Sequence, residues 1–211
     1  MNNLLITKHS HRLTESIVNQ MEGRTFHHHF HILYDIVTAI NKDNINFFEI
    51  GSFCGASSSL VLSHQKIINA FCLDTFSEAS PDLVARNLSK FKKSKDSNFT
   101  LIEGDSTDAL IVSKARELVK NIDLLYIDGD HSFNGCLTDF LNYSDLVNPG
   151  GYIVFDDYND VEYSPQVKHA VDFIVSDFIL GQFEVIGCFK NLLNAHPREM
   201  IYNNQFVLKR L

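Results

Sequence analysis

The chain has 211 residues, 45% of them hydrophobic, which supplies one full core and is too little for two large domains. Its formal net charge of −8 excludes the proteins that bind nucleic acid through a basic face, because such proteins neutralise phosphates with clustered Lys and Arg. No stretch approaches the roughly 18 uninterrupted apolar residues of a membrane span, and no basic start precedes a long apolar run, so neither a membrane partner nor a signal peptide is expected.

The predicted elements begin with two helices, over residues 12–21 and 26–40, in an N-terminal helical segment (residues 1–41) on the acceptor side of the main domain (residues 42–211). Short apolar runs ending at Gly or Asp follow and are typical of buried strands: 45–50, 69–73, 99–103, 122–127 and 151–155. Helical patterns alternate with them, most clearly over 132–146 and over 164–178, where Ser164 is placed to cap and Pro165 takes the first position. The last runs, 183–188 and 205–208, have no helix between them and predict an antiparallel hairpin. This alternation predicts an α/β fold with a parallel sheet covered on both faces.

The helix predicted over 26–40 carries four histidines, at positions 27–29 and 31. His27 and His31 share a helical face at i, i+4, a spacing that can hold Zn²⁺. No cysteine or acid lies nearby in sequence to complete such a site, so we assign no metal to it. We expect these histidines to line the mouth of the active site or to lie on a half-exposed helix whose apolar side faces the core.

The run from Phe47 to Ser57 is the most informative part of the chain, because an apolar strand ends in Glu49 and opens through Gly51 and Gly55 into a helix. This arrangement seats a nucleotide-like cofactor, since glycine lets the backbone approach the ligand and the helix directs free N–H groups at it. Phe53 stands where a dinucleotide fingerprint needs glycine, which argues against a nicotinamide cofactor. Glu49 would repel a phosphate and suits a ligand with a cationic amino group or a hydroxyl.

Acidic residues follow the next two strands, where ligands of an open α/β sheet bind. Asp74 ends the second strand and is placed to accept hydrogen bonds from two ribose hydroxyls. Asp105 follows the third strand and could accept a hydrogen bond from an adenine amine. Each acid alone could equally be a solvated turn or helix cap, but their placement after successive strands favours a shared ligand.

Five motifs in register resemble the class I S-adenosylmethionine-dependent methyltransferases, over roughly residues 45–160: 49–57, 73–74, 103–105, 128–131 and 149–151. Within that class the chain looks most similar to small O-methyltransferases. The resemblance implies a Rossmann-like fold with a seven-stranded, mostly parallel sheet and an antiparallel C-terminal strand. It also implies these cofactor-binding residues: Glu49, Gly51, Ser52, Gly55, Ala56 and Ser57 beneath the methionine part, Asp74 at the ribose, Asp105 and Ser106 on the adenine side, and Asp128.

Metal-dependent members of this group place an Asp after strand four and an Asp-Asn pair after strand five. By resemblance these positions correspond to Asp128, Asp156 and Asp157, although Asp157 stands where asparagine is usual. If the two strands are adjacent, carboxylates crowd one small volume, and Mg²⁺ or Mn²⁺ would relieve their repulsion. The alternative is a metal-free relative in which these acids bind only the cofactor and the substrate.

His131 lies three residues after Asp128, where that branch carries a catalytic lysine. Methyl transfer from a sulfonium is an in-line displacement, and an imidazole beside Asp128 is a plausible general base for removing the acceptor's proton. We therefore assign His131 and Asp128 as catalytic residues. The alternative for His131 is a loop or N-cap histidine at the start of the helix over 132–146.

The function expected from these features is O-methylation of a small hydroxylated acceptor, a sugar or a natural product, with S-adenosylmethionine as cofactor. The alternatives are an N-methyltransferase and a noncatalytic adenosine-ligand-binding or assembly module of the same fold. The four cysteines are widely separated, with no Cys-x-x-Cys pair, which is typical of a reduced protein in the cytoplasm. The apolar N-terminal helices could supply the face of a homodimer.

Overall fold

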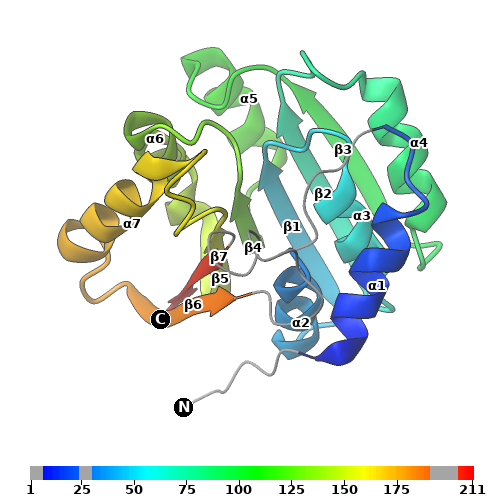
Figure 1. Ribbon diagram of the computed structural model, residues 1–211, viewed down its shortest axis with the longest axis horizontal. Helices are drawn as coiled ribbons and strands as arrows, with labels where there is room; N and C mark the ends of the chain where they lie inside the picture. Colours follow the sequence, from blue (N-terminus) through cyan, green and yellow to red (C-terminus); the bar gives the residue numbers. More distant parts are fainter. Residues whose placement is uncertain (1–6, 24–29, 191–203) are drawn as a thin grey trace.

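The computed structural model describes residues 7–23, 30–190 and 204–211, and a seven-stranded sheet runs through its middle (Figure 1). The strand order is β3-β2-β1-β4-β5-β7-β6. The strands are β1 (Asn44–Ile50), β2 (Ile67–Asp74), β3 (Asn98–Glu103), β4 (Ile122–Ile127), β5 (Val147–Phe155), β6 (Phe183–Lys190) and β7 (Asn204–Arg210). β1 to β5 are parallel, whereas β7 pairs antiparallel with both β5 and β6. The predicted fold and the predicted C-terminal hairpin are confirmed.

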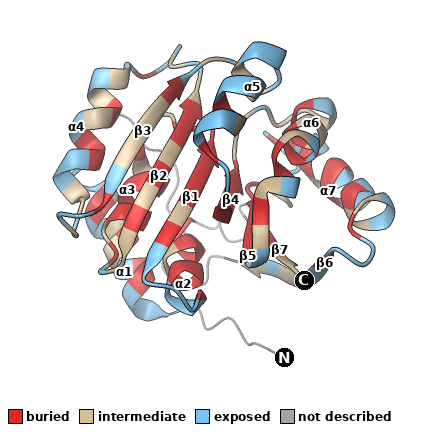
Figure 2. Ribbon diagram, turned by 180° about the vertical axis from the view of Figure 1, so that it is seen from behind, coloured by how far each residue is buried: buried red, intermediate tan, exposed pale blue. Residues whose placement is uncertain are grey.

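Helices cover both faces of this sheet, so that its central strands are buried (Figure 2). On one face lie α1 (Lys8–Val18), α2 (Ile32–Ala39), α3 (Ala56–Leu62) and α4 (Pro81–Phe91), and on the other lie α5 (Ala109–Leu118), α6 (Phe133–Tyr143) and α7 (Pro165–Asp177). Successive strand side chains point to opposite faces, so Phe47 packs in the first core and Phe48 in the second. Each fully buried Phe contributes about 1.5–3 kcal/mol of transfer free energy.

Helix boundaries differ from the sequence expectations where caps decide them. α1 begins at Lys8, four residues before the predicted helix, because the Thr7 side chain accepts a hydrogen bond from the Ser10 N–H. α2 begins at Ile32, while residues 24–29 of the predicted helix lie outside the described ranges. α6 ends at Tyr143 and passes into a 3₁₀ turn over Ser144–Leu146, so the predicted helix 132–146 was too long.

The N-terminal helices are integral to the first core. Ile17 of α1 and Ile36 of α2 pack in the same cluster as Phe47 of β1. The buried carboxylate of Asp35 ties the two helices together by accepting a hydrogen bond from the Ser10 hydroxyl (2.7 Å). The apolar side chains of α2 pack inside this core. The division at residue 42 and the expected homodimer stay predictions. Within the described ranges, no helix has the length and apolar character needed to cross a membrane.

Candidate active site

A cleft of about 420 Å³ lies at the carboxyl ends of β1 to β4, where the strand order reverses between β1 and β4. This is the position at which open α/β sheets bind ligands, and the volume is that of a small-molecule site. Five of the predicted cofactor residues line it: Gly51, Asp74, Asp105, Ser106 and Asp128. The residues that follow four different strands, β1 to β4, thus line one cavity.

Gly51 lines the cleft where the end of β1 approaches the residues after β4. Its φ is +86°, and a Cβ at this position would lie 1.9 Å from the backbone oxygen of Asp128. The close approach follows from the sheet pairing continuing past the strand ends, since the Asp128 N–H donates to the Ile50 carbonyl (2.9 Å). Only glycine fits between β1 and β4 here, which is the physical reason for the glycine in this loop.

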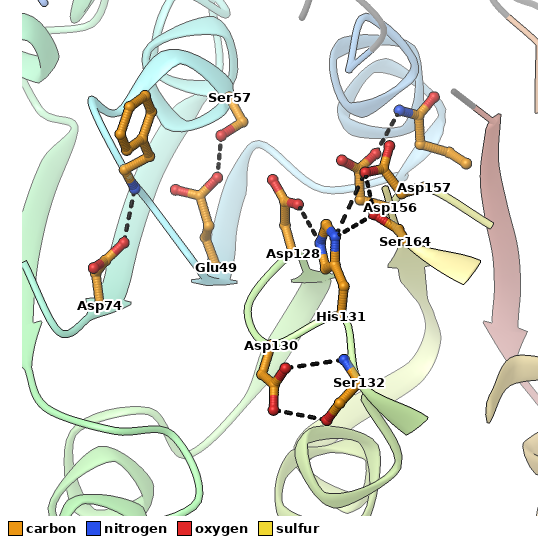
Figure 3. Close-up of polar contacts among 12 residues, drawn as sticks. Glu49, Ser57, Asp74, Asp128, Asp130, His131, Ser132, Asp156, Asp157 and Ser164 are labelled. Atoms are coloured by element: carbon orange, nitrogen blue, oxygen red, sulfur yellow. Dashed lines mark hydrogen bonds and ion pairs between the residues drawn. The ribbon is translucent and has the colours of Figure 1, made fainter. Parts of the chain in front are cut away.

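Asp74 fixes the shape of the loop after β1 (Figure 3). One carboxylate oxygen accepts a hydrogen bond from the Phe53 N–H (2.7 Å) and the other accepts one from the Phe76 N–H (2.7 Å). Phe53 has a φ of +44°, a left-handed conformation that is strained for an aromatic residue. Each carboxylate oxygen can accept more than one hydrogen bond, so Asp74 retains acceptor capacity toward ribose hydroxyls.

Asp105 and Ser106 form the cleft wall after β3. The Asp105 carboxylate accepts hydrogen bonds from the backbone N–H (2.8 Å) and the hydroxyl (2.7 Å) of Thr107, and these bonds lower the pKa of Asp105. The Tyr143 hydroxyl donates to the Ser106 carbonyl (2.9 Å) and holds this turn against α6. Asp105 therefore presents a fixed negative charge at the predicted adenine end.

Glu49 lies behind the loop instead of on the cleft wall. It is 0% exposed, and its two carboxylate oxygens accept hydrogen bonds from the hydroxyls of Ser57 and Ser58. Figure 3 shows the bond from Ser57. Burial raises the pKa of Glu49 to about 7, against the opposing effect of the two hydroxyls. Ser52 is also buried, while Gly55 and Ala56 form the N-cap and the first residue of α3. These five predicted residues support the loop, and a direct contact of theirs with the cofactor stays a prediction.

His131 lies beside Asp128 at the end of β4, as the sequence predicts (Figure 3). The Nε2 atom is 3.2 Å from Asp128 Oδ1, and the Nδ1 atom is 2.7 Å from Ser164 Oγ. Of the alternative for His131, the N-cap role is wrong, because the N-cap is Ser132, whose hydroxyl accepts from the Gly135 N–H (3.0 Å). The loop position is as expected, since His131 precedes the helix. Both ring nitrogens of His131 therefore contact residues at the ends of other elements and not the backbone of α6.

Ser164 was predicted to cap α7, and it occupies the N-cap position without a side-chain capping bond. Its hydroxyl instead donates to Asp157 Oδ2 (2.9 Å) and contacts His131. A serine N-cap bond typically stabilises a helix by about 1 kcal/mol, and α7 lacks this contribution. Ser164 was not predicted as a site residue, and its one signal in the sequence is its position shortly after the fifth strand.

The three carboxylates of the predicted metal site do not converge on one point. Asp156 Oδ1 accepts a hydrogen bond from Gln205 of β7 (2.9 Å), and the His131 ring lies between Asp128 and Asp157. Among the residues that the structure describes, no group of three or more His, Cys, Asp or Glu side chains is arranged to hold a metal ion. This arrangement does not fit the predicted Mg²⁺ or Mn²⁺, so we derive no step through a metal.

Of the histidine run, residues 27–29 lie outside the described ranges. His31 is 1% exposed and its ring lies 4.3 Å from that of His11, between α1 and α2. For His31, a place at the mouth of the active site is therefore wrong. The expected half-exposed helix is observed, because Thr38 and Ala39 of α2 are exposed. Phe30, Leu33 and Val37 are buried in the first core, as predicted.

Comparisons with known proteins agree with this fold and cleft. A family model described as "Methyltransferase domain" matches residues 48–158. The chain is 41% identical over 203 residues to "Uncharacterized protein R132" of Acanthamoeba polyphaga mimivirus, an alignment that covers 92% of this chain and 91% of that protein. The matched range runs from β1 to the residues after β5 and so contains the whole cleft.

Solved structures with the same fold include an rRNA methylase from Streptococcus thermophilus (TM-score 0.62, 17% identity, 90% of this chain and 99% of that one). They also include an O-methyltransferase from Bacillus cereus in complex with SAH (0.59, 14%, 100% and 94%). A third is the apo structure of CalS11, a TDP-rhamnose 3'-O-methyltransferase of calicheamicin biosynthesis (0.58, 16%, 99% and 84%). These identities show the fold alone. The family match and the cleft that Gly51 lines together show what the protein is. The chain belongs to the methyltransferase domain family and is a class I S-adenosylmethionine-dependent methyltransferase.

Proposed function

We propose that this enzyme methylates a hydroxyl oxygen of a small acceptor, a sugar or a natural-product scaffold, with His131 as the general base. The observation that carries the proposal is the position of His131: its Nε2 atom lies 3.2 Å from Asp128, a residue of the cleft wall. A side chain that can take up a proton thus stands at the edge of the cofactor cavity. The fold shared with CalS11, which methylates a sugar hydroxyl, supports the same acceptor class.

S-adenosylmethionine, when bound, supplies an electrophilic methyl carbon on a sulfonium. The chain's residues must hold the acceptor oxygen in line behind that carbon and remove its proton as the new O–C bond forms and the C–S electron pair leaves with sulfur. His131 Nε2 takes the proton, and the Asp128 carboxylate stabilises the imidazolium that results. General-base catalysis of this kind contributes about 10²–10⁴-fold to the rate.

The net negative charge supports a small acceptor over a nucleic acid. The S. thermophilus neighbour is an rRNA methylase, but this chain carries a net charge of −8, which repels a phosphate backbone. We propose no nucleic-acid or membrane partner, and a reduced, cytoplasmic setting in keeping with the cysteine pattern. The N-methyltransferase alternative lacks an observation in its favour.

The test combines cofactor titration with an acceptor panel. S-adenosylhomocysteine binding is measured by calorimetry, and methyl transfer is measured against sugars, nucleotide sugars, phenols and RNA. His131→Ala should lower turnover by about 10²–10⁴-fold while the dissociation constant of S-adenosylhomocysteine changes little. His169→Ala, at an exposed histidine of α7, is the matched control and should keep full activity.

Two results would overturn parts of the proposal. Full turnover in the His131→Ala enzyme would remove His131 as the base. Methylation of RNA with no transfer to any small hydroxylated compound would reject the acceptor class.

A further inference from the structure

We propose that Ser164 and Asp157 are positioning residues that fix the tautomer of His131, so that its proton sits on Nδ1 and its bare nitrogen faces the cofactor cleft. The inference rests on the proposed function only for the destination of the acceptor's proton. Ser164 lies 33 residues from His131 in the chain, and α7 brings it to the far side of the ring from Asp128 (Figure 3).

The direction of the hydrogen bonds carries the argument. A serine hydroxyl has one proton, and Ser164 donates it to Asp157 Oδ2 at 2.9 Å. Toward His131, 2.7 Å away, the same oxygen can then only accept, so the ring must donate from Nδ1. A neutral imidazole has one N–H, which leaves Nε2 as a lone pair able to take a proton.

Asp128 acts in the opposite sense, because its carboxylate favours a proton on Nε2. The distances and the burial of the partners favour the proton on Nδ1 over the proton on Nε2. The Nδ1 contact is 2.7 Å, whereas the Nε2 contact is 3.2 Å, at the long end of the hydrogen-bond range. Ser164 is 3% exposed and the Asp157 side chain 8% exposed, while the Asp128 side chain is 26% exposed and screened by water. Asp157 Oδ2 is also 3.5 Å from Nδ1 and reinforces the proton there.

The helix cap supplies a second, independent observation. At the starts of four other helices the N-cap side chain accepts a bond from the helix backbone: Thr7, Ser80, Asp108 and Ser132. Ser164 occupies the same position on α7 and makes no such bond. Its hydroxyl instead contacts His131 and Asp157, so this side chain serves the site and not the helix end. Replacing Ser164 by alanine consequently removes no capping bond, so the variant should fold.

The test reads the tautomer directly by long-range ¹H–¹⁵N correlation spectra of ¹⁵N-histidine-labelled protein near pH 8, with the His131 signals assigned from His131→Ala. The wild-type ring should show a protonated Nδ1 and a bare Nε2. In Ser164→Ala the ratio of the Nδ1–H to the Nε2–H form should fall about 2- to 12-fold, the factor that one hydrogen bond supplies. Ser164→Thr, which keeps the hydroxyl, should restore the wild-type pattern.

Ser176→Ala is the matched control, since Ser176 is an exposed serine of the same helix and should leave the His131 signals unchanged. A wild-type ring that is protonated on Nε2, alone or on both nitrogens, would overturn the inference, as would a Ser164→Ala spectrum identical to wild type. None of these readings requires methyl transfer. An inactive His131→Ala enzyme with an unaltered Ser164→Ala tautomer would thus leave the proposed function standing and reject this inference alone.

Discussion

Asp139 of α6 is fully buried behind the cleft wall, and neither of its carboxyl oxygens completes a hydrogen bond within the described structure. Burial raises the pKa of Asp139 from 3.8 to about 7, with the neighbouring Ser106 hydroxyl opposing the rise. An ionised carboxylate in this position is costly, so the folded protein retains the proton that the unfolded chain releases near pH 4.

The sign of the effect on stability follows from that proton. Between about pH 4 and pH 7 the folded state binds more protons than the unfolded chain, so the free energy of unfolding falls as the pH rises. Three pKa units at about 1.4 kcal/mol each set an upper limit of about 4 kcal/mol on this loss. Asp139→Asn should remove the loss and stabilise the protein at neutral pH relative to wild type.

Urea unfolding of wild type and Asp139→Asn at pH 5 and pH 7.5 checks this prediction. Glu49, whose pKa is raised in the same direction, is present in both proteins and cancels in the difference. Asp82→Asn, at an exposed aspartate of α4, is the control and should follow wild type. Equal pH dependence in Asp139→Asn and wild type would show that Asp139 is ionised when buried.

At the scale of elements, the loop between β1 and α3 depends on a glycine that no other residue can replace. In Gly51→Ala the new Cβ would lie 1.9 Å from the Asp128 carbonyl oxygen, and that neighbour is backbone. Relief of the clash requires β1 and β4 to separate at their carboxyl ends, where the cleft lies. We expect the variant to lose S-adenosylhomocysteine binding in calorimetry and to unfold at a lower temperature.

Gly181→Ala separates this clash from backbone strain. Gly181 also has a positive φ, +73°, but a Cβ there would meet nothing within 4 Å. In Gly181→Ala the backbone strain alone should lower the free energy of unfolding by about 1–2 kcal/mol. Ligand binding should stay intact. Normal binding by Gly51→Ala would contradict the close approach of the two strands.

Most strands were predicted well because each is a local apolar run that ends where a turn residue begins. The start of β5 was missed: it begins at Val147, four residues before the predicted run, because the Asn-Pro-Gly sequence at 148–150 interrupts the apolar pattern. β4 over Ile122–Ile127 agrees at both ends, and all six of its residues are buried, so no exposed position blurs the pattern. α6 was predicted less well: Leu141 keeps the helical spacing of the apolar face but is 48% exposed. The spacing of apolar residues identifies the apolar face of a helix. How much of that face is buried depends on the elements that pack against it.

At the scale of the whole molecule, a ligand that binds only the folded state must raise its stability. S-adenosylhomocysteine at about 100 times its dissociation constant should raise the free energy of unfolding by about 2.7 kcal/mol. For a chain of this size that shifts the midpoint of thermal unfolding upward by roughly 5–11 °C. Differential scanning fluorimetry measures the shift.

NAD⁺ at the same concentration should leave the midpoint unchanged. Phe53 occupies the place of a fingerprint glycine, and its N–H is held by Asp74. An equal shift with NAD⁺ would contradict the assignment of the cleft to the methyl donor.

The sequence by itself determined the α/β class, the glycine loop after β1 and the acids at the strand ends, because each depends on residues that are neighbours in the chain. The tertiary structure alone decided that β7 lies between β5 and β6 and that Glu49 accepts hydrogen bonds from two serines of α3. It also decided that Ser164 contacts His131, which lies 33 residues away in the sequence. Those contacts depend on strand order and helix direction. Local periodicity carries no information about either, since it reports which face of an element is buried and not which element covers it.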